Sequence, residues 1–185
     1  DDDARLDHVI IYATMGLGAR AQHAVRGLRR TYMKGGVGEL QLAIAGVGAL
    51  HDLRALDGGQ ANGIQKLLGP PGGATSWTTS TPFVPPRHLK KRGRSSLIAQ
   101  VEEELAVRGC PPVNVDVLEW TGETLALRHF VRRRVRGPQP PVDAGFGVRL
   151  RFERPVAGPI CLGYGCHFGL GRFSAELTVS DAEWE

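Results

Sequence analysis

The sequence predicts an α+β fold, and two observations lead to this class. Apolar residues change repeatedly between strand-like and helix-like spacing, in the order β-α-β-β-α-β over residues 8–120. The chain also contains 25 Gly and 12 Pro among its 185 residues, which supply the turns between many short elements. With 42% hydrophobic and 23% charged residues, it has the composition of a chain that folds.

The first three elements begin close to the N-terminus. Residues 8–13 form a continuous apolar run, which predicts a central strand buried on both faces. Apolar residues then recur at helical spacing from Leu17 to Leu28, and we expect this helix to end at the glycine pair 35–36. Residues 39–47 alternate in character, which predicts a strand with one buried face.

The second three elements follow a long glycine-rich loop at residues 48–74, in which we expect one helical turn. Residues 75–84 are rich in β-branched and aromatic side chains, which favour a strand. Ser95 or Ser96 is expected to cap the next helix, and residues 113–120 alternate as a strand. The six elements together have the order of a ferredoxin-like unit, which is also the topology of the RNA-recognition motif.

The remaining sequence predicts a second, degenerate ferredoxin-like half. We place the first half at residues 1–122 and the second at residues 123–185. The second half is expected to contain strands at 127–135 and 146–153 with no helix between them, and a last strand near 173–179.

Positive charge is concentrated in two segments. The chain has a net charge of +4, yet residues 126–136 hold five Arg and residues 87–94 hold five Lys or Arg, without any acid in either segment. Two such segments favour a polyanionic partner. A solvated charged face is the alternative. The acidic run Glu102 to Glu104 is interpreted as solvated, or as facing a basic partner subunit.

The cysteines and the N-terminal sequence bear on compartment and cofactors. The three cysteines are an odd number and no secretory signal precedes them, so we expect a reducing, cytoplasmic compartment without a membrane span. Cys161, Cys166 and His167 have the wrong spacing for a zinc knuckle, and we expect no metal and no small-molecule cofactor. Because residue 1 is Asp, we expect a mature product or a piece of a longer chain.

A glycine-rich loop at residues 163–171 is the first candidate site. Its four glycines, Gly163, Gly165, Gly169 and Gly171, let backbone N–H groups approach a phosphate closely. The loop has neither the Lys-Ser/Thr ending of a P-loop nor the spacing of a dinucleotide-binding fingerprint. A tight turn before the last strand is the alternative.

Residues 162–173 resemble the C-terminal glycine-rich loop of the RAMP superfamily, the ferredoxin-like RNA-binding proteins of CRISPR systems. Two further stretches, Ser80 to Arg94 and Arg136 to Pro141, resemble the fused Cas-five/Cas-six protein of type I-U (I-G) systems. The resemblance spans residues 6–176 and implies the Cas-six portion, without its Cas-five half.

The resemblance implies an activity and partners. Such a protein would bind the hairpin of CRISPR repeat RNA and cut it without metal, through attack by a 2′-hydroxyl that leaves a 2′,3′-cyclic phosphate. It would remain on the guide RNA together with the Cas-five half and the Cas-seven backbone of an effector complex. The alternatives are a subunit that caps the RNA hairpin without cutting it, and a domain that binds a small anion in the glycine-rich loop.

Histidines and cations are the residues that such chemistry needs. We expect His23, which follows the first predicted strand, and His88, which follows the third, to approach one edge of the sheet as catalytic groups. For each of them a plain surface histidine is the alternative. Cations and one aromatic side chain would bind the RNA backbone and stack on a base. The residues expected to contact RNA are Arg26, Arg30, Arg87, Lys90, Lys91, Arg92, Arg94, Arg128, Phe130, Arg132, Arg134, Gly163, Gly165, His167, Gly169, Gly171 and Arg172.

Overall fold

The computed structural model describes residues 9–32, 38–54, 61–119, 121–122, 124–128 and 139–177. The chain divides into two compact units, an N-terminal unit of residues 1–49 and a C-terminal unit of residues 50–185. The predicted division between residues 122 and 123 stays a prediction, although one sheet takes strands from both sides of that position.

In residues 9–32 and 38–49, the N-terminal unit contains one helix and a two-stranded ribbon. Helix α1 spans Ala19–Gly27, and strands β1 (Arg30–Tyr32) and β2 (Glu39–Gln41) pair antiparallel. The predicted extension of the helix to residues 35–36 is wrong. Leu28 adopts an extended backbone conformation, so the chain leaves the helix there and turns into β1.

The predicted strand at residues 8–13 is also wrong in its described part. Residues 9–13 form no strand, and Val9 and Ile11 are exposed. A continuous apolar run does not by itself specify a strand, because it carries no periodicity and no partner. The predicted strand at 39–47 is reduced to the three residues of β2, which pairs with β1 and not with a central sheet.

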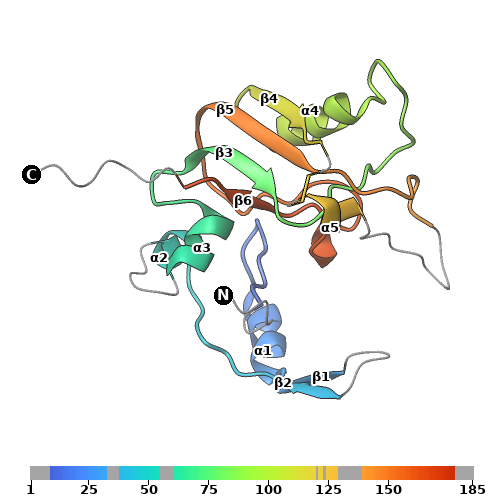
Figure 1. Ribbon diagram of the computed structural model, residues 1–185. Coiled ribbons are helices and arrows are strands. Elements are labelled where there is room, and N and C mark those ends of the chain that lie inside the picture. The colour runs from blue at the N-terminus through green and yellow to red at the C-terminus, as the bar shows by residue number, and fades with distance from the viewer. Residues whose placement is uncertain are drawn as a thin grey trace, which may run out of the picture. The chain divides into compact units, whose positions relative to one another are not determined.

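The C-terminal unit holds most of the secondary structure (Figure 1). Its elements in chain order are α2 (Leu50–Arg54), α3 (Ala61–Leu68), β3 (Ala74–Thr79), α4 (Leu97–Val107), β4 (Val113–Val117), α5 (Leu125–Arg128), β5 (Val148–Val156), the 3₁₀ turn η1 (Cys166–Phe168) and β6 (Phe173–Ala175). Helices α2 and α3 occupy a segment predicted as a loop with one helical turn. The predicted strand at 127–135 is wrong at residues 127–128, which belong to α5.

Four strands of this unit form one antiparallel sheet with the order β4-β5-β3-β6. The α+β class is therefore confirmed. The predicted strands at 75–84, 113–120 and 146–153 correspond to β3, β4 and β5, and the last predicted strand corresponds to β6. The ferredoxin-like order predicted for residues 8–120 is not confirmed, because the described residues of its first two strands lie outside this sheet.

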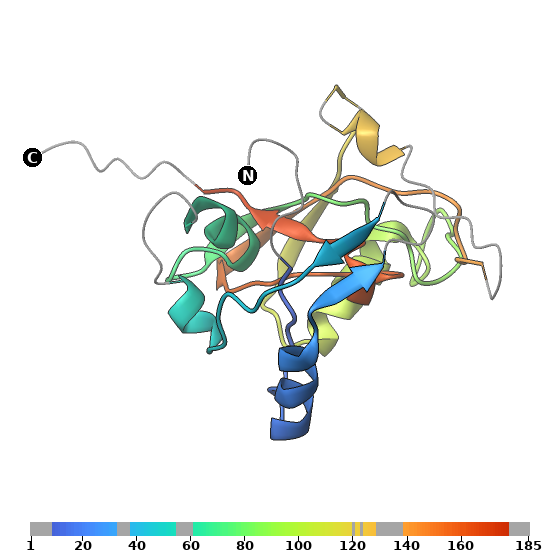
Figure 2. The same ribbon diagram turned by 90° about the horizontal axis from the view of Figure 1, so that it is seen from below.

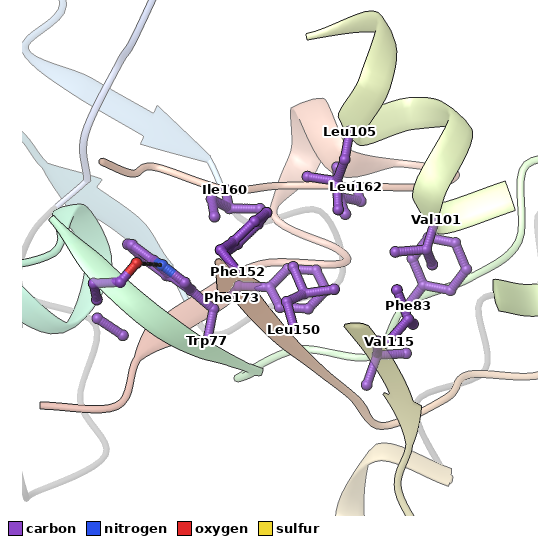
Figure 3. Packing of buried hydrophobic residues seen from close by; sticks show 13 residues of the cluster. Trp77, Phe83, Val101, Leu105, Val115, Leu150, Phe152, Ile160, Leu162 and Phe173 are labelled. Carbon is purple, nitrogen blue, oxygen red and sulfur yellow. Dashed lines mark hydrogen bonds between the residues drawn. The ribbon is translucent and has the colours of Figure 1, made fainter. Parts of the chain in front are cut away.

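One face of the sheet is buried beneath α4 and the segment that leads to β6. Trp77, Leu150 and Phe173 are fully buried on this face, and Val101 and Leu105 reach it from α4 (Figure 3). The indole Nε1 of Trp77 donates to the carbonyl of Ala74 at 3.0 Å, so its polar atom is satisfied within the core. Each large side chain buried here contributes roughly 1.5–3 kcal/mol.

The other face of the sheet carries polar side chains. Glu176, which follows β6, accepts hydrogen bonds from Ser76, Thr78 and Arg149, and Arg151 pairs with Asp116 at 2.6 Å. Burial by itself raises the pKa of Glu176, but these three hydrogen bonds outweigh it and hold the pKa below its ordinary value.

The ends of α4 follow the sequence closely. The hydroxyl of Ser96 accepts from the amide of Ala99 at 3.2 Å, which makes Ser96 the N-cap, as predicted. Gly109, with φ +71°, ends the helix in the left-handed conformation that favours glycine. Helix α3 lies beside β6 (Figure 1 and Figure 2). Leu68 of α3 is fully buried.

Candidate nucleic-acid interface

One end of the sheet brings together segments that are far apart in the sequence. Thr79, the last residue of β3, pairs with Phe173, the first residue of β6. Val117, the last residue of β4, pairs with Val148, the first residue of β5. We call this the loop end of the sheet. The glycine-rich loop leads into β6 at this end of the sheet. The chain that leads from β3 to the basic residues 87–94 leaves the sheet at the same end.

The segment after β3 is hydrogen-bonded to the glycine-rich loop. The amide of Tyr164 donates to the carbonyl of Val84 at 2.8 Å, and the amide of Gly171 donates to the carbonyl of Pro82 at 2.9 Å. The hydroxyl of Thr81 donates to the carbonyl of Gly169 at 2.7 Å. The two stretches that carry most of the resemblance, 80–94 and 162–173, therefore lie against each other.

Two glycines of this loop, Gly163 and Gly171, are needed for close packing against neighbouring backbone. A Cβ on Gly171 would lie 1.8 Å from the carbonyl oxygen of Leu162, and a Cβ on Gly163 would lie 2.5 Å from that of Val84. Seven of the nine amides from Gly163 to Gly171 donate hydrogen bonds to protein groups. These seven amides are consequently already bonded within the protein, and the expected role of the glycines in RNA contact stays a prediction.

The side chains that the loop presents to solvent are polar and aromatic. His167 and Phe168 in η1 are exposed, and 75% of the Phe168 surface is accessible. Arg172 is also exposed, and its Nε donates to the hydroxyl of Ser80 at 2.9 Å. Phe168 was missed from the sequence, although an aromatic residue one position before Gly169 was a visible signal.

The basic loop, residues 87–94, is anchored to the first turns of α4. The amide of Arg87 donates to the buried side chain of Gln100 at 3.1 Å. The amide of Lys90 donates to the carbonyl of Ser95 at 2.9 Å, which closes the loop at its far side. The side chains of His88, Lys90, Lys91 and Arg92 are exposed, as expected of residues that contact a polyanion.

Two neighbouring glutamates of α4 hold the two loops. Glu103 pairs with Arg87 and with Arg94, and the hydrogen bonds from these two arginines, that from Arg87 foremost, lower the pKa of Glu103. Glu104 accepts from the amide of Gly163 at 3.0 Å and pairs with Arg108 at 3.5 Å. Glu102 is exposed as expected, and Glu103 keeps 37% of its side-chain surface accessible while it pairs with the two arginines. The ion pairs of Glu103 and Glu104 within the protein were not predicted, and a basic partner subunit stays a prediction.

The predicted residues of the N-terminal unit form a separate group. His23 and Arg26 are exposed on α1. Arg30 does not share their helix face, because it lies in β1 and pairs with Glu39 at 3.3 Å. Since His23 and His88 belong to different units, their expected approach to one edge stays a prediction. An open depression of about 620 Å³ in this unit is lined by Arg26, Arg29, Leu42, Ala43, Ile44 and Val47.

The second basic segment, residues 126–136, is described only as far as Arg128. Arg128 ends the short helix α5, and Phe130, Arg132 and Arg134 lie outside the described residues. A Cβ on Gly145 would lie 3.0 Å from the carbonyl oxygen of Leu127 and 2.6 Å from Cβ of Pro82. Leu127 therefore lies close to Gly145 and Pro82, near the loop end of the sheet.

Metal-binding clusters and membrane-spanning helices are absent from the described part of the chain. There, no three His, Cys, Asp or Glu side chains gather as a metal ion would require. Burial raises the pKa of the Cys161 thiol, which disfavours the thiolate form that binds metals. Among the helices of the described ranges, none combines the length and the apolar character needed to cross a bilayer.

Comparison with known proteins adds no relative. A scan against protein-family models, a search of curated proteins and a search of solved structures each found no match to this chain.

Proposed function

We propose that this protein binds the hairpin of CRISPR repeat RNA at the loop end of the sheet and cleaves it without metal. The observation that carries the proposal is the contact between stretches 80–94 and 162–173. These stretches resemble the same family, are far apart in the sequence, and hydrogen-bond to each other through Val84 and Tyr164. Together they expose cations, two histidines and an aromatic ring, which are the groups that bind structured RNA.

The strand order supports the family's fold in a shifted position. The elements follow in the order β3-α4-β4-α5-β5-η1-β6, and the sheet order β4-β5-β3-β6 places the first and third of these four strands in the middle. This is the arrangement of a ferredoxin-like unit. We propose such a unit over residues 74–175, in which the segment containing η1 stands where the second helix would be.

The proposed reaction exchanges one bond to phosphorus for another and moves two protons. The 2′-hydroxyl oxygen attacks the adjacent phosphorus and loses its proton to a base, while the bond from phosphorus to the 5′-oxygen breaks and that oxygen gains a proton. His88 is our first choice for one of these proton transfers, because Lys90, Lys91 and Arg92 beside it would stabilise the charge that develops on the phosphate. His23 is the second choice.

A specific observation also favours the non-catalytic alternative. His88 and His167 are exposed, and no hydrogen bond orients either imidazole within the described part of the chain. A general base is commonly oriented by a neighbouring group. A protein that caps the hairpin of the guide RNA, within a complex of Cas-five and Cas-seven subunits, needs only the cationic surface.

Binding is tested by titrating labelled repeat hairpin RNA at several salt concentrations. We expect affinity to fall steeply with salt, and Lys90→Gln to lower the slope of log Kd against log salt by about 1. Lys66→Gln is the matched control, because Lys66 is exposed on α3, which precedes the opposite end of β3. The absence of hairpin binding at low salt would refute the proposed function.

Cleavage is tested with stoichiometric protein in EDTA. We expect a 2′,3′-cyclic phosphate product, and a loss of about 100-fold or more in the single-turnover rate for His88→Ala. His51→Ala is the control, because His51 lies on α2 and pairs with Asp52. Intact RNA with tight binding would favour the capping function. A loss for His23→Ala alone would move the assignment to that residue.

A further inference from the structure

The basic loop has both of its ends tied to one carboxylate. Glu103 accepts a hydrogen bond from Arg87 at the start of the loop and from Arg94 at its end, the latter at 2.9 Å. Arg87 also reaches the carbonyl of Arg94 at 3.4 Å. Residues 88–93 therefore form a loop whose two flanking residues, Arg87 and Arg94, both bind one glutamate of α4. We call residues 88–93 the arch, and we call its attachment through Arg87 and Arg94 to Glu103 the Glu103 clamp.

The Glu103 clamp separates the five cations of the loop into two classes. Arg87 and Arg94 share one negative charge, whereas Lys90, Lys91 and Arg92 at the top of the arch have no carboxylate partner among the residues that the structure describes. The three upper cations would thus meet a polyanion first. The spacing of these three cations is fixed as long as Arg87 and Arg94 both stay bound to Glu103.

A folded RNA and an unfolded strand differ in how they use such an arch. The phosphates of a hairpin stem have fixed positions, so cations held at matching positions gain affinity because little ordering is lost on binding. A single strand adapts its backbone to any cationic surface, and for it the total charge matters most. Rigidity of the arch would therefore increase the preference for hairpin over single strand.

We propose that Glu103 is a positioning residue that holds the basic loop as a preformed arch and thereby sets the preference for folded RNA. The claim about the preference for folded RNA rests on the proposed function. The claim that Glu103 holds the arch closed concerns the protein alone. The negative charge of Glu103 opposes the binding of any polyanion. Removal of this charge should therefore raise the affinity for single-stranded RNA and lower the preference for hairpin RNA.

The test compares Glu103→Gln with Glu102→Gln. Both variants remove one negative charge from neighbouring positions of α4, but Glu102 is exposed and takes no part in the clamp. A third variant, Arg94→Lys, keeps the charge and weakens the planar geometry on which the clamp depends. Circular dichroism melting establishes that all three fold.

The first readout needs no RNA. A protease cleaves a loop faster when the loop opens more often, so trypsin cleavage after Lys90, Lys91 and Arg92 should accelerate about fivefold in Glu103→Gln and in Arg94→Lys. Glu102→Gln should be cleaved at the wild-type rate. Equal cleavage of all four proteins would overturn the proposal.

The second readout is the ratio of Kd values for single-stranded and hairpin RNA of equal length. We expect Glu102→Gln to strengthen both affinities alike and to leave the ratio unchanged. Glu103→Gln should strengthen single-strand binding and reduce the ratio about fivefold. If Glu103→Gln keeps the wild-type ratio while the wild type binds hairpin RNA, the inference fails and the proposed function stands. If the wild type binds no hairpin, the proposed function fails, and the trypsin result still decides the arch.

Discussion

Replacing glycines within the glycine-rich loop tests whether backbone packing holds that loop in place. Gly171 and Gly169 both have positive φ, +57° and +90°, so alanine is strained at either position by about 1–2 kcal/mol. They differ in their surroundings. A Cβ at Gly169 meets no heavy atom within 4 Å, whereas a Cβ at Gly171 would lie 1.8 Å from the carbonyl oxygen of Leu162.

Gly171→Ala lowers the free energy of unfolding further, because two hydrogen bonds of Gly171 must lengthen to make room for the new Cβ. Its amide donates to the carbonyl of Pro82, and its own carbonyl accepts from the amide of Leu162, each at 2.9 Å. Moving the chain far enough to admit a Cβ weakens both bonds, at roughly 1 kcal/mol each. We therefore expect Gly171→Ala to lower the free energy of unfolding by about 3–4 kcal/mol and Gly169→Ala by about 1–2 kcal/mol.

Urea unfolding followed by tryptophan fluorescence measures both values, because Trp77 is fully buried. In thermal melts the two variants should differ by about 4–8 °C. Equal losses for the two variants, or a smaller loss for Gly171→Ala, would refute the claim that close packing against Leu162 requires this glycine.

Three further predictions concern the helix cap, a carboxylate and an aromatic ring. Ser96→Ala should lower the free energy of unfolding by about 1 kcal/mol in urea titrations, and Ser95→Ala, whose hydroxyl caps nothing, by less than about 0.5 kcal/mol. The pKa of Glu176 lies below its ordinary value of 4.5, so its stabilisation is present above that pH and is lost as the pH falls through the lower, folded-state pKa. The melting temperature of Glu176→Gln should consequently depend less on pH in the acid range than that of the wild type, and identical profiles would contradict the assigned hydrogen bonds. Phe168→Ala should weaken RNA binding in titrations by about 1–3 kcal/mol if the ring stacks on a base, with Val107→Ala, exposed on α4, as the unaffected control.

The elements that the sequence predicted well are those whose signals are local. Helix α4 has a serine cap and an apolar stripe within its own residues. The alternation at residues 113–120 predicts β4, in which Val115 is buried between the less buried Asn114 and Asp116. The run at residues 8–13 offered apolar character without periodicity or a partner. Pairing with a distant strand is decided by the whole chain, so this run could not be assigned to a sheet from its own composition.

In the candidate site, too, the residue types could be predicted from the sequence and the contacts between distant residues could not. The cations of the basic loop and the glycines at 163 and 171 were visible as residue types, but their neighbours were not. Glu103 meets Arg87 across 16 positions of the chain, and Glu104 meets Gly163 across 59. In the sequence both glutamates belong to one acidic run, and nothing local distinguishes a glutamate that anchors a loop from one that faces water.

The internally satisfied backbone of the glycine-rich loop has a consequence for how this protein can diverge. Since most amides between Gly163 and Gly171 donate to protein groups, hydrogen bonds of the main chain support the course of the loop. The exposed position 167 can therefore exchange one residue type for another while these bonds stay in place. The surface chemistry of the loop can change at that position without a change of fold.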